Sequence, residues 1–153
     1  LGYCGASKEI IAAMNKIQSQ STTSTSSITM AASVEALNGD QDFILKHNEE
    51  FKRRRDLVVE KLNNIDGISC DTPPGAFYVY PSCFGIIGKR TPKGDIIATD
   101  EDLMNFLLET EGVAGVHGAA FGLSPYFRLS YATDEKTLID ACDRIGKACN
   151  NLK

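Results

Sequence analysis

The sequence predicts an α/β chain, more narrowly an α+β domain in which helices cover a small, largely antiparallel sheet. Two observations lead to this prediction. Apolar residues recur at helical spacing in several segments, and short β-prone runs lie between those segments. The resulting order is helices, two strands, a helix, two strands and a last helix, for which helices on one side of a sheet are the economical arrangement. A length of 153 residues, 42% of them hydrophobic and 24% charged, is enough for a folded core.

The first 63 residues are expected to form a short strand and three helices. Residues 1–6 are interpreted as a strand, after which Ser7 caps a helix. The apolar face of this helix consists of Ile10, Ile11, Met14 and Ile17. The helix is expected to fade over residues 18–25, an ordered loop whose hydroxyl groups compete for backbone hydrogen bonds. A second helix covers residues 26–37, and Asp40 caps a third over residues 41–63.

The remaining residues contain the predicted sheet and two more helices. Strands are expected at residues 68–70, 76–80, 113–116 and 124–133. Residues 83–97 are rich in Gly, Lys and Pro and are interpreted as an exposed excursion. One helix follows Thr99 and ends at Glu111-Gly112, and Asp134 and Glu135 open the last helix. Its apolar face consists of Leu138, Ile139, Cys142, Ile145 and Cys149.

Charge and composition argue against several classes of function. A net charge of −4 and a pI near 5.2 do not suit a nucleic-acid surface. No apolar run approaches the roughly 20 residues that span a bilayer. The five cysteines lack C-x-x-C spacing and lie apart from both histidines, so we expect free thiols in a reducing compartment and no metal site.

Arg128 is the most informative single residue, because it is one arginine inside an apolar, β-prone run. A desolvated guanidinium without an acidic partner costs several kcal/mol, and its fork geometry matches a carboxylate or a phosphate. No acidic residue lies on the same predicted strand. Arg128 is therefore a candidate receptor for an anion; the alternative is a structural ion pair with a carboxylate elsewhere in the fold.

The same run, Ser124-Pro125-Tyr126-Phe127-Arg128-Leu129-Ser130-Tyr131-Ala132-Thr133, resembles the closing strand of the class I aminotransferases. These are pyridoxal-phosphate enzymes of the aspartate aminotransferase type. Four further stretches agree with this resemblance. The strand after the cofactor lysine resembles Leu1-Gly2-Tyr3, and a helix end and loop at the dimer interface resemble Lys16-Ile17-Gln18-Ser19-Gln20-Ser21-Thr22. The hinge helix resembles Arg53-Arg54-Arg55-Asp56, and the start of the small-domain sheet resembles Pro74-Gly75-Ala76-Phe77-Tyr78-Val79.

The resemblance implies two parts of one enzyme. Residues 1–38 would form the C-terminal end of the large cofactor-binding domain, and residues 39–153 the C-terminal small domain. The lysine that binds pyridoxal 5'-phosphate as a Schiff base would lie upstream of Leu1, as would the groups that hold the pyridinium and the phosphate. We therefore expect the C-terminal portion of an aminotransferase, inactive by itself and without bound cofactor, since its own lysines fall on helix surfaces or loops.

The resemblance also implies roles for particular residues. Arg128 would bind the α-carboxylate of the amino-acid substrate. Gln20, Ser21 and Thr22 would reach the active site of the neighbouring subunit in a homodimer; the alternative is an interface loop with backbone contacts only. No arginine occurs between Leu1 and Gln41, so recognition of a dicarboxylate would use other groups, as in a bacterial subgroup.

Three other features have a structural interpretation that competes with a functional one. The basic patch, Arg53 to Arg55, is interpreted as a solvated helix face beside Glu49 and Glu50, or as an interdomain contact. His117, where many relatives have proline, is expected to be a packed residue rather than a catalyst. Tyr78 and Tyr80 are expected in the core of the sheet rather than in contact with a cofactor.

The expected function of the complete protein is transfer of an amino group between aspartate or glutamate and a 2-oxo acid, in the cytoplasm. An aromatic amino-acid or prephenate aminotransferase of the same family is one alternative. The other is a stand-alone, non-catalytic module that binds a carboxylate metabolite or a partner protein. That module would leave the apolar face around Met14 uncovered, which is usual for an interface rather than for a free surface.

Overall fold

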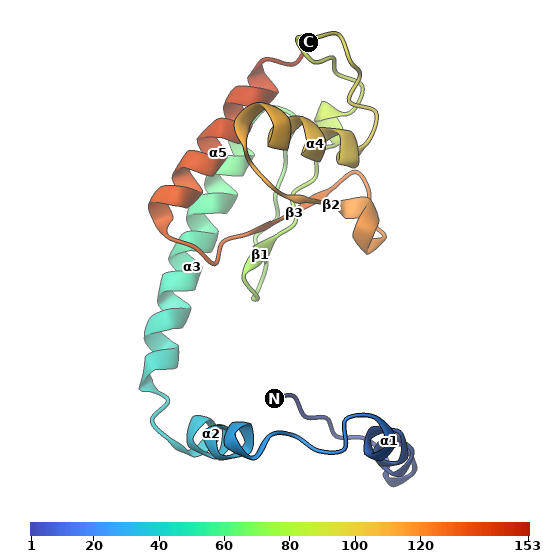
Figure 1. The fold of residues 1–153 in the computed structure, drawn as a ribbon. Coiled ribbons are helices and arrows are strands. Elements are labelled where there is room, and N and C mark those ends of the chain that lie inside the picture. The colour runs from blue at the N-terminus through green and yellow to red at the C-terminus, as the bar shows by residue number, and fades with distance from the viewer. The chain divides into compact units, whose positions relative to one another are not determined.

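The computed structural model describes all 153 residues, which divide into two compact units, Leu1–Leu45 and Lys46–Lys153 (Figure 1). The first unit contains α1 (Lys8–Ser21) and α2 (Ser27–Asn38). The helix α3 (Asp42–Asn63) runs from the end of the first unit into the second. No helix is both long enough and apolar enough to cross a membrane.

The first unit differs from its prediction before α1. Residues 1–6 form no strand, because a strand needs a neighbour for its backbone N–H and C=O groups. The helix ends at Ser21, within residues 18–25 where it was expected to fade, and the Ser21 hydroxyl donates a hydrogen bond back to Ile17 O at 3.3 Å. The predicted α2 is confirmed, and Gly39 ends it.

The second unit contains the predicted sheet, with three short strands in the order β1-β3-β2 and both pairs antiparallel. The strands are β1 (Tyr78–Val79), β2 (Val116–His117) and β3 (Phe127–Ser130). The predicted strand at residues 68–70 is wrong: it contributes only one isolated bridge, between Ser69 and Ser82. One bridge is too little for a strand, because a ladder needs consecutive paired residues.

Helices cover one face of this sheet, as predicted. Both α4 (Asp100–Glu111) and α5 (Glu135–Asn150) begin at side-chain caps, Thr99 and Asp134, that accept hydrogen bonds from backbone N–H groups. The C-terminal half of α3 lies beside α5 (Figure 1), where Lys61 pairs with Asp143 at 2.7 Å. The fully buried core residues are shared between these helices and the sheet: Leu62, Val79, Cys83, Ile86, Leu103, Phe127 and Ile145.

The predicted exposed excursion at residues 83–97 is partly wrong. It contains a 3-10 turn, η1 (Phe84–Ile86), and the side chains of Cys83, Ile86 and Ile97 are buried. Gly, Lys and Pro indicate an irregular backbone, but the three apolar side chains among them bring that backbone onto the core.

All five cysteines are free thiols, four of them buried and Cys4 exposed. Burial raises the pKa of Cys70, Cys142 and Cys149 to about 11 and that of Cys83 to about 12. The buried thiols therefore stay protonated at neutral pH and pack as small apolar groups.

Candidate functional site

Arg128 lies on the sheet face that points away from the core. Side chains alternate along a strand, and the neighbours Phe127 and Tyr131 are only 0% and 2% exposed. Arg128 pairs with Val116 in the register, and its side chain lies on the opposite face from that of Phe127, half-buried rather than fully buried. The strand is thus apolar because one face of it forms the core, and the arginine is on the other face.

Two aromatic rings contact the Arg128 guanidinium. Its central carbon lies 4.4 Å from the ring centroid of Tyr78 and 4.4 Å from that of Phe121. Tyr78 reaches it because Tyr78 is paired with Ser130, which places its ring diagonally across the same sheet face. Such stacking is worth about 0.5–2 kcal/mol and uses the faces of the guanidinium, so its N–H edges stay available.

Arg128 forms no ion pair and no hydrogen bond within the chain, although 20 acidic residues are present. The structural ion pair that competes with the receptor interpretation is therefore absent from this structure. A half-buried, unpaired cation that is held against two rings is suited to binding a carboxylate bidentately.

The segment that contains Phe121 is a tight loop, residues 118–126, which includes the 3-10 turn η2 (Gly118–Phe121). Gly118 donates a hydrogen bond to Tyr126 O at 2.7 Å, which closes the loop. A Cβ at Gly118 would lie 2.7 Å from Tyr126 O and would overlap Leu123 O, so the closure requires glycine. The loop geometry therefore sets where the Phe121 ring lies.

The turn before β1 is also fixed by side chains from other elements. The Tyr131 hydroxyl donates to Ala76 O at 2.8 Å, and Arg55 donates to Pro73 O at 3.1 Å. Ala76 has a positive φ of 64°, which is strained for a residue with a Cβ. These bonds hold the strained turn that leads directly to Tyr78.

Gln20, Ser21 and Thr22 lie at the C-terminal end of α1, in the first unit, and all three are exposed. Ser21 bonds to backbone carbonyls of its own helix, and the Gln18 amide donates to the Thr22 hydroxyl. Arg128 belongs to the second unit.

The basic patch is largely paired. Arg53 and Arg54 both bond to Glu50 at 2.9 Å, and Arg53 also pairs with Glu135 of α5. Arg55 pairs with Asp56 at 2.6 Å. The solvated-face interpretation accounts for Arg53, but Arg55 is only 17% exposed and helps to fix the turn at Pro73.

His117 is a half-buried residue of β2, opposite Phe127 in the register. The two rings that contact Arg128, those of Tyr78 and Phe121, were not predicted as functional. Tyr78 and Tyr80 were expected in the core of the sheet, and both are half-buried. The positions of these rings depend on strand register and loop closure, which no local sequence pattern specifies. The aromatic alternation in residues 76–80 was the one available signal, and it does not distinguish a core face from a binding face.

The lysines of this chain do not fit pyridoxal 5'-phosphate. A lysine that binds a carbonyl cofactor covalently works from a desolvated site that lowers its pKa. None of the ten lysines is buried. The two that are half-buried, Lys61 and Lys89, pair with Asp143 and Asp66. The hydrogen bond to Asp143 raises the pKa of Lys61, which is the opposite of what a Schiff-base lysine needs. We therefore assign no reaction step through the cofactor to these residues.

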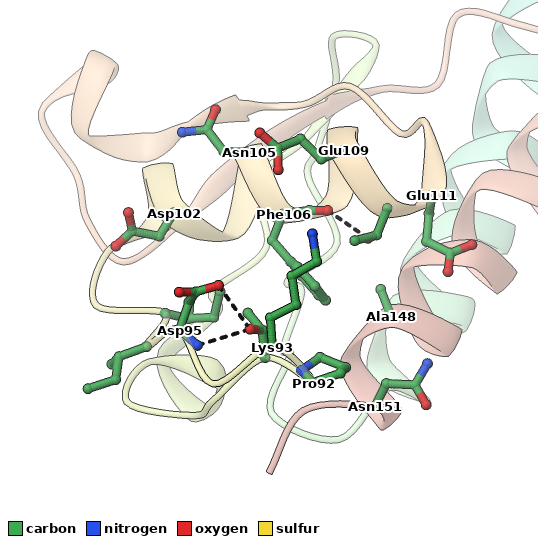
Figure 2. A pocket seen from close by; sticks show the side chains of 14 residues that line it. Pro92, Lys93, Asp95, Asp102, Asn105, Phe106, Glu109, Glu111, Ala148 and Asn151 are labelled. Atoms are coloured by element: carbon green, nitrogen blue, oxygen red, sulfur yellow. Dashed lines mark hydrogen bonds between the residues drawn. The ribbon is translucent and has the colours of Figure 1, made fainter.

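A separate cavity of about 340 Å³ lies between α4, the C-terminal end of α5 and residues 91–97 (Figure 2). Three of the carboxylates that line it have partners within the fold: Asp102 caps α4, Glu111 pairs with Lys147 at 2.9 Å, and Asp95 accepts a hydrogen bond from the Thr91 hydroxyl at 3.5 Å. The other charged residues of the lining, Lys93 and Glu109, are exposed. We place the candidate site at Arg128, where an unpaired cation is held in a fixed orientation.

The family model "Aminotransferase class I and II" matches residues 1–145. The probable aspartate/prephenate aminotransferase of Rhizobium leguminosarum bv. phaseoli is 55% identical over 153 residues, which are 100% of this chain and 38% of that protein. The aspartate aminotransferase of Rhizobium meliloti (strain 1021) is 55% identical over 152 residues, 99% of this chain and 37% of that protein.

Solved structures agree with these matches. The crystal structure of the aspartate aminotransferase from Rhizobium meliloti has a TM-score of 0.94 at 54% identity, over 97% of this chain and 37% of that one. The Thermus thermophilus aspartate aminotransferase with maleate has a TM-score of 0.80 at 36% identity, over 92% and 35%. The chain thus spans little more than a third of the length of these relatives. It belongs to the class I and II aminotransferases, and it corresponds to their C-terminal part.

Proposed function

We propose that this chain is the C-terminal part of a pyridoxal-phosphate-dependent aminotransferase, in which Arg128 binds the α-carboxylate of the amino-acid substrate. The observation that supports this most strongly is the state of Arg128: half-buried, stacked on Tyr78 and Phe121, and without an acidic partner. A structural arginine would be paired, whereas a receptor keeps its N–H edges available for the ligand.

The role of Arg128 is to bind and orient. Two parallel N–H···O bonds fix the plane of a carboxylate, and this orients the bond from its α-carbon to hydrogen. The rings of Tyr78 and Phe121 keep the guanidinium in place before the substrate arrives, which lowers the ordering cost of binding. The cofactor, when bound by the complete enzyme, supplies the electron sink for the amino-group transfer.

The test is Arg128→Leu in the complete holoenzyme. We expect transamination of L-aspartate to fall by about 100-fold or more, because a charge-assisted bidentate contact is lost from the substrate. The cofactor absorbance spectrum should stay unchanged. The measurements are kcat/KM for L-aspartate and the visible spectrum of the enzyme.

Arg144→Leu is the matched control, because Arg144 lies on the surface of α5 and pairs with Asp140 at 2.9 Å. It should leave kcat/KM unchanged. If Arg128→Leu binds L-aspartate as tightly as the unmodified enzyme does, the proposed role of Arg128 is wrong.

Aspartate or glutamate are the proposed amino donors, and 2-oxoglutarate or oxaloacetate the acceptors. The names of similar proteins support aspartate, and several, among them those from Rhizobium leguminosarum and Cereibacter sphaeroides, also name prephenate. Measuring kcat/KM for L-aspartate, with 2-oxoglutarate and then prephenate as acceptor, distinguishes the two specificities.

We further propose a cytoplasmic homodimer in which residues 1–38 belong to the large domain and residues 39–153 form the small domain. Exposed apolar side chains on α1 and α2, such as Ile17 at 71% and Ile28 at 81%, support an interface for the first unit. Gln20, Ser21 and Thr22 would then contact the site of the neighbouring subunit. Light scattering on the complete enzyme tests the dimer, and a monomeric mass would contradict it.

A further inference from the structure

The loop of residues 118–126 is anchored by a buried carboxylate. Asp100, the first residue of α4, is only 1% exposed. Its Oδ2 accepts hydrogen bonds from the backbone N–H of Ala119 at 3.1 Å and of Tyr126 at 3.3 Å. A buried carboxylate costs several kcal/mol unless hydrogen bonds compensate it, and here the two donors come from the two ends of one loop.

Tyr80 holds the same loop through its carbonyl groups. Its hydroxyl lies 3.0 Å from Gly118 O and 3.3 Å from Leu123 O, so its one proton is shared between two acceptors. Its ring stacks on Tyr126, with centroids 5.6 Å apart and planes 13° apart, and meets Phe121 edge-on at 6.3 Å. The loop is thus fixed at its N–H groups by Asp100, and at its C=O groups by Tyr80.

The Tyr80 hydroxyl is close enough to both Asp100 and Arg128 for their charges to act on its pKa. Desolvation raises the pKa of the Tyr80 hydroxyl, the negative charge of Asp100 adds to the rise, and the positive charge of Arg128 opposes it. Both charges therefore act on one hydroxyl, which stays protonated and able to donate at neutral pH.

Phe121 transmits the loop position to Arg128. Its side chain is 50% exposed, so the core does not fix it, and its place over the guanidinium depends on the backbone of the loop. We propose that Asp100 and Tyr80 are positioning residues, which hold residues 118–126 so that Phe121 keeps Arg128 oriented for the substrate carboxylate. This proposal rests on the proposed function of Arg128.

The test compares Asp100→Ala, Asp100→Asn and Tyr80→Phe in the holoenzyme, with KM and kcat for L-aspartate measured separately. We expect Asp100→Ala to raise KM about tenfold, since the loop loses both bonds to a charged acceptor. Asn keeps one acceptor oxygen and should restore most of the affinity. Tyr80→Phe removes only the hydroxyl and should raise KM about threefold. In each variant kcat should change less than KM.

Asp102→Ala is the matched control, because its carboxylate lies in the same helical turn but bonds only to Ala98 and Thr99. It should lower the melting temperature and leave KM unchanged. An equal rise of KM in Asp102→Ala would overturn the proposal, since loss of any carboxylate at this helix end would then suffice.

Arg128→Leu separates the two proposals. If it abolishes binding while Asp100→Ala and Tyr80→Phe leave KM unchanged, only the positioning role is wrong. If Arg128→Leu itself leaves KM unchanged, the proposed function fails, and the positioning role fails with it. Should Asp100→Ala not fold, Tyr80→Phe decides the matter, and an unchanged KM there overturns the positioning role.

Discussion

The two units of this chain use their apolar residues in opposite ways. In Lys46–Lys153, residues from three helices and the sheet form one core, and Leu62, Leu103 and Ile145 are 0% exposed. In Leu1–Leu45, neither α1 nor α2 has a buried residue, although their sequence contains Ile, Met, Val and Leu at regular intervals.

The difference shows where the stability of this chain originates. Burial of apolar surface contributes about 25 cal/mol per Å², and the second unit has that contribution while the first does not. Helices of 14 and 12 residues are marginal in water without tertiary packing. Local sequence signals therefore predict helices in both units, but the partners that a helix meets determine whether it is stable.

Hydrogen exchange should show the largest difference between the units. In the 153-residue chain we expect the core amides of α5 to exchange at least about 10³-fold more slowly than the same amides in an unfolded peptide, because their hydrogen bonds open only with global unfolding. Amides of α1 and α2 should be protected less than about tenfold. Mass spectrometry after deuterium labelling measures both, and equal protection in the two units would contradict the comparison.

Shortening one isoleucine in each unit, buried in α5 and exposed in α1, tests the same contrast by mutation. Ile145→Ala removes a fully buried side chain of α5 and should lower the free energy of unfolding by about 2–5 kcal/mol. Ile17→Ala, at a position that is 71% exposed in α1, should change it by less than about 0.5 kcal/mol. Urea unfolding gives both values, and a comparable loss in Ile17→Ala would show packing that the structure lacks.

A glycine pair tests backbone crowding. Gly118→Ala places a methyl group against Tyr126 O at 2.7 Å and should cost about 1–3 kcal/mol, with displacement of the loop. At Gly5 nothing lies within 4 Å of an added Cβ, so Gly5→Ala should be nearly neutral. Thermal unfolding measures the costs. A melting temperature of Gly118→Ala equal to that of the unmodified chain would mean that the loop closes differently.

Helix caps provide a smaller contrast. Thr99 forms a capping box with Asp102 at the start of α4, so Thr99→Ala should cost about 1 kcal/mol. Ser26 is at the corresponding position of α2 but accepts no cap hydrogen bond. Ser26→Ala should therefore have no measurable effect in the same urea titration, and a loss similar to that of Thr99→Ala would contradict the assigned caps.

The smallest effect concerns pH. Hydrogen bonds from the Thr137 hydroxyl and backbone N–H hold the pKa of Asp134 below its ordinary value of 3.8. A lowered folded-state pKa contributes stability above the ordinary value, which is lost as the pH falls through the folded value. Asp134→Asn should thus slightly weaken the dependence of the free energy of unfolding on pH below pH 3.8. Urea unfolding at a series of pH values measures this dependence, and a dependence in Asp134→Asn identical to that of the unmodified chain would contradict these hydrogen bonds.

The helices of this fold could be predicted because their signals are local. Thr99 with three acidic residues after it marks the start of α4, and Gly112, with a φ of 66°, marks its end. The strands were harder to place, because two to four residues form each one and their limits depend on partners elsewhere in the chain.

The candidate site could be predicted only in part. Arg128 stands out in the sequence as a charge among apolar residues, and the structure adds that no carboxylate pairs with it. Its neighbours could not be found in this way, because Tyr78 and Phe121 meet Arg128 through strand register and loop closure. Asp100 resembles any acidic residue of a first helical turn, and only its 1% exposure distinguishes it from Asp102.

The distribution of thiols makes this chain convenient for spectroscopy. Cys4 is exposed in the first unit, whereas the four thiols of the second unit are buried and have a raised pKa. A maleimide dye or spin label should therefore attach at one position without removal of native cysteines. A second label at an introduced cysteine on α5 would then allow the distance between the two labelled positions to be measured.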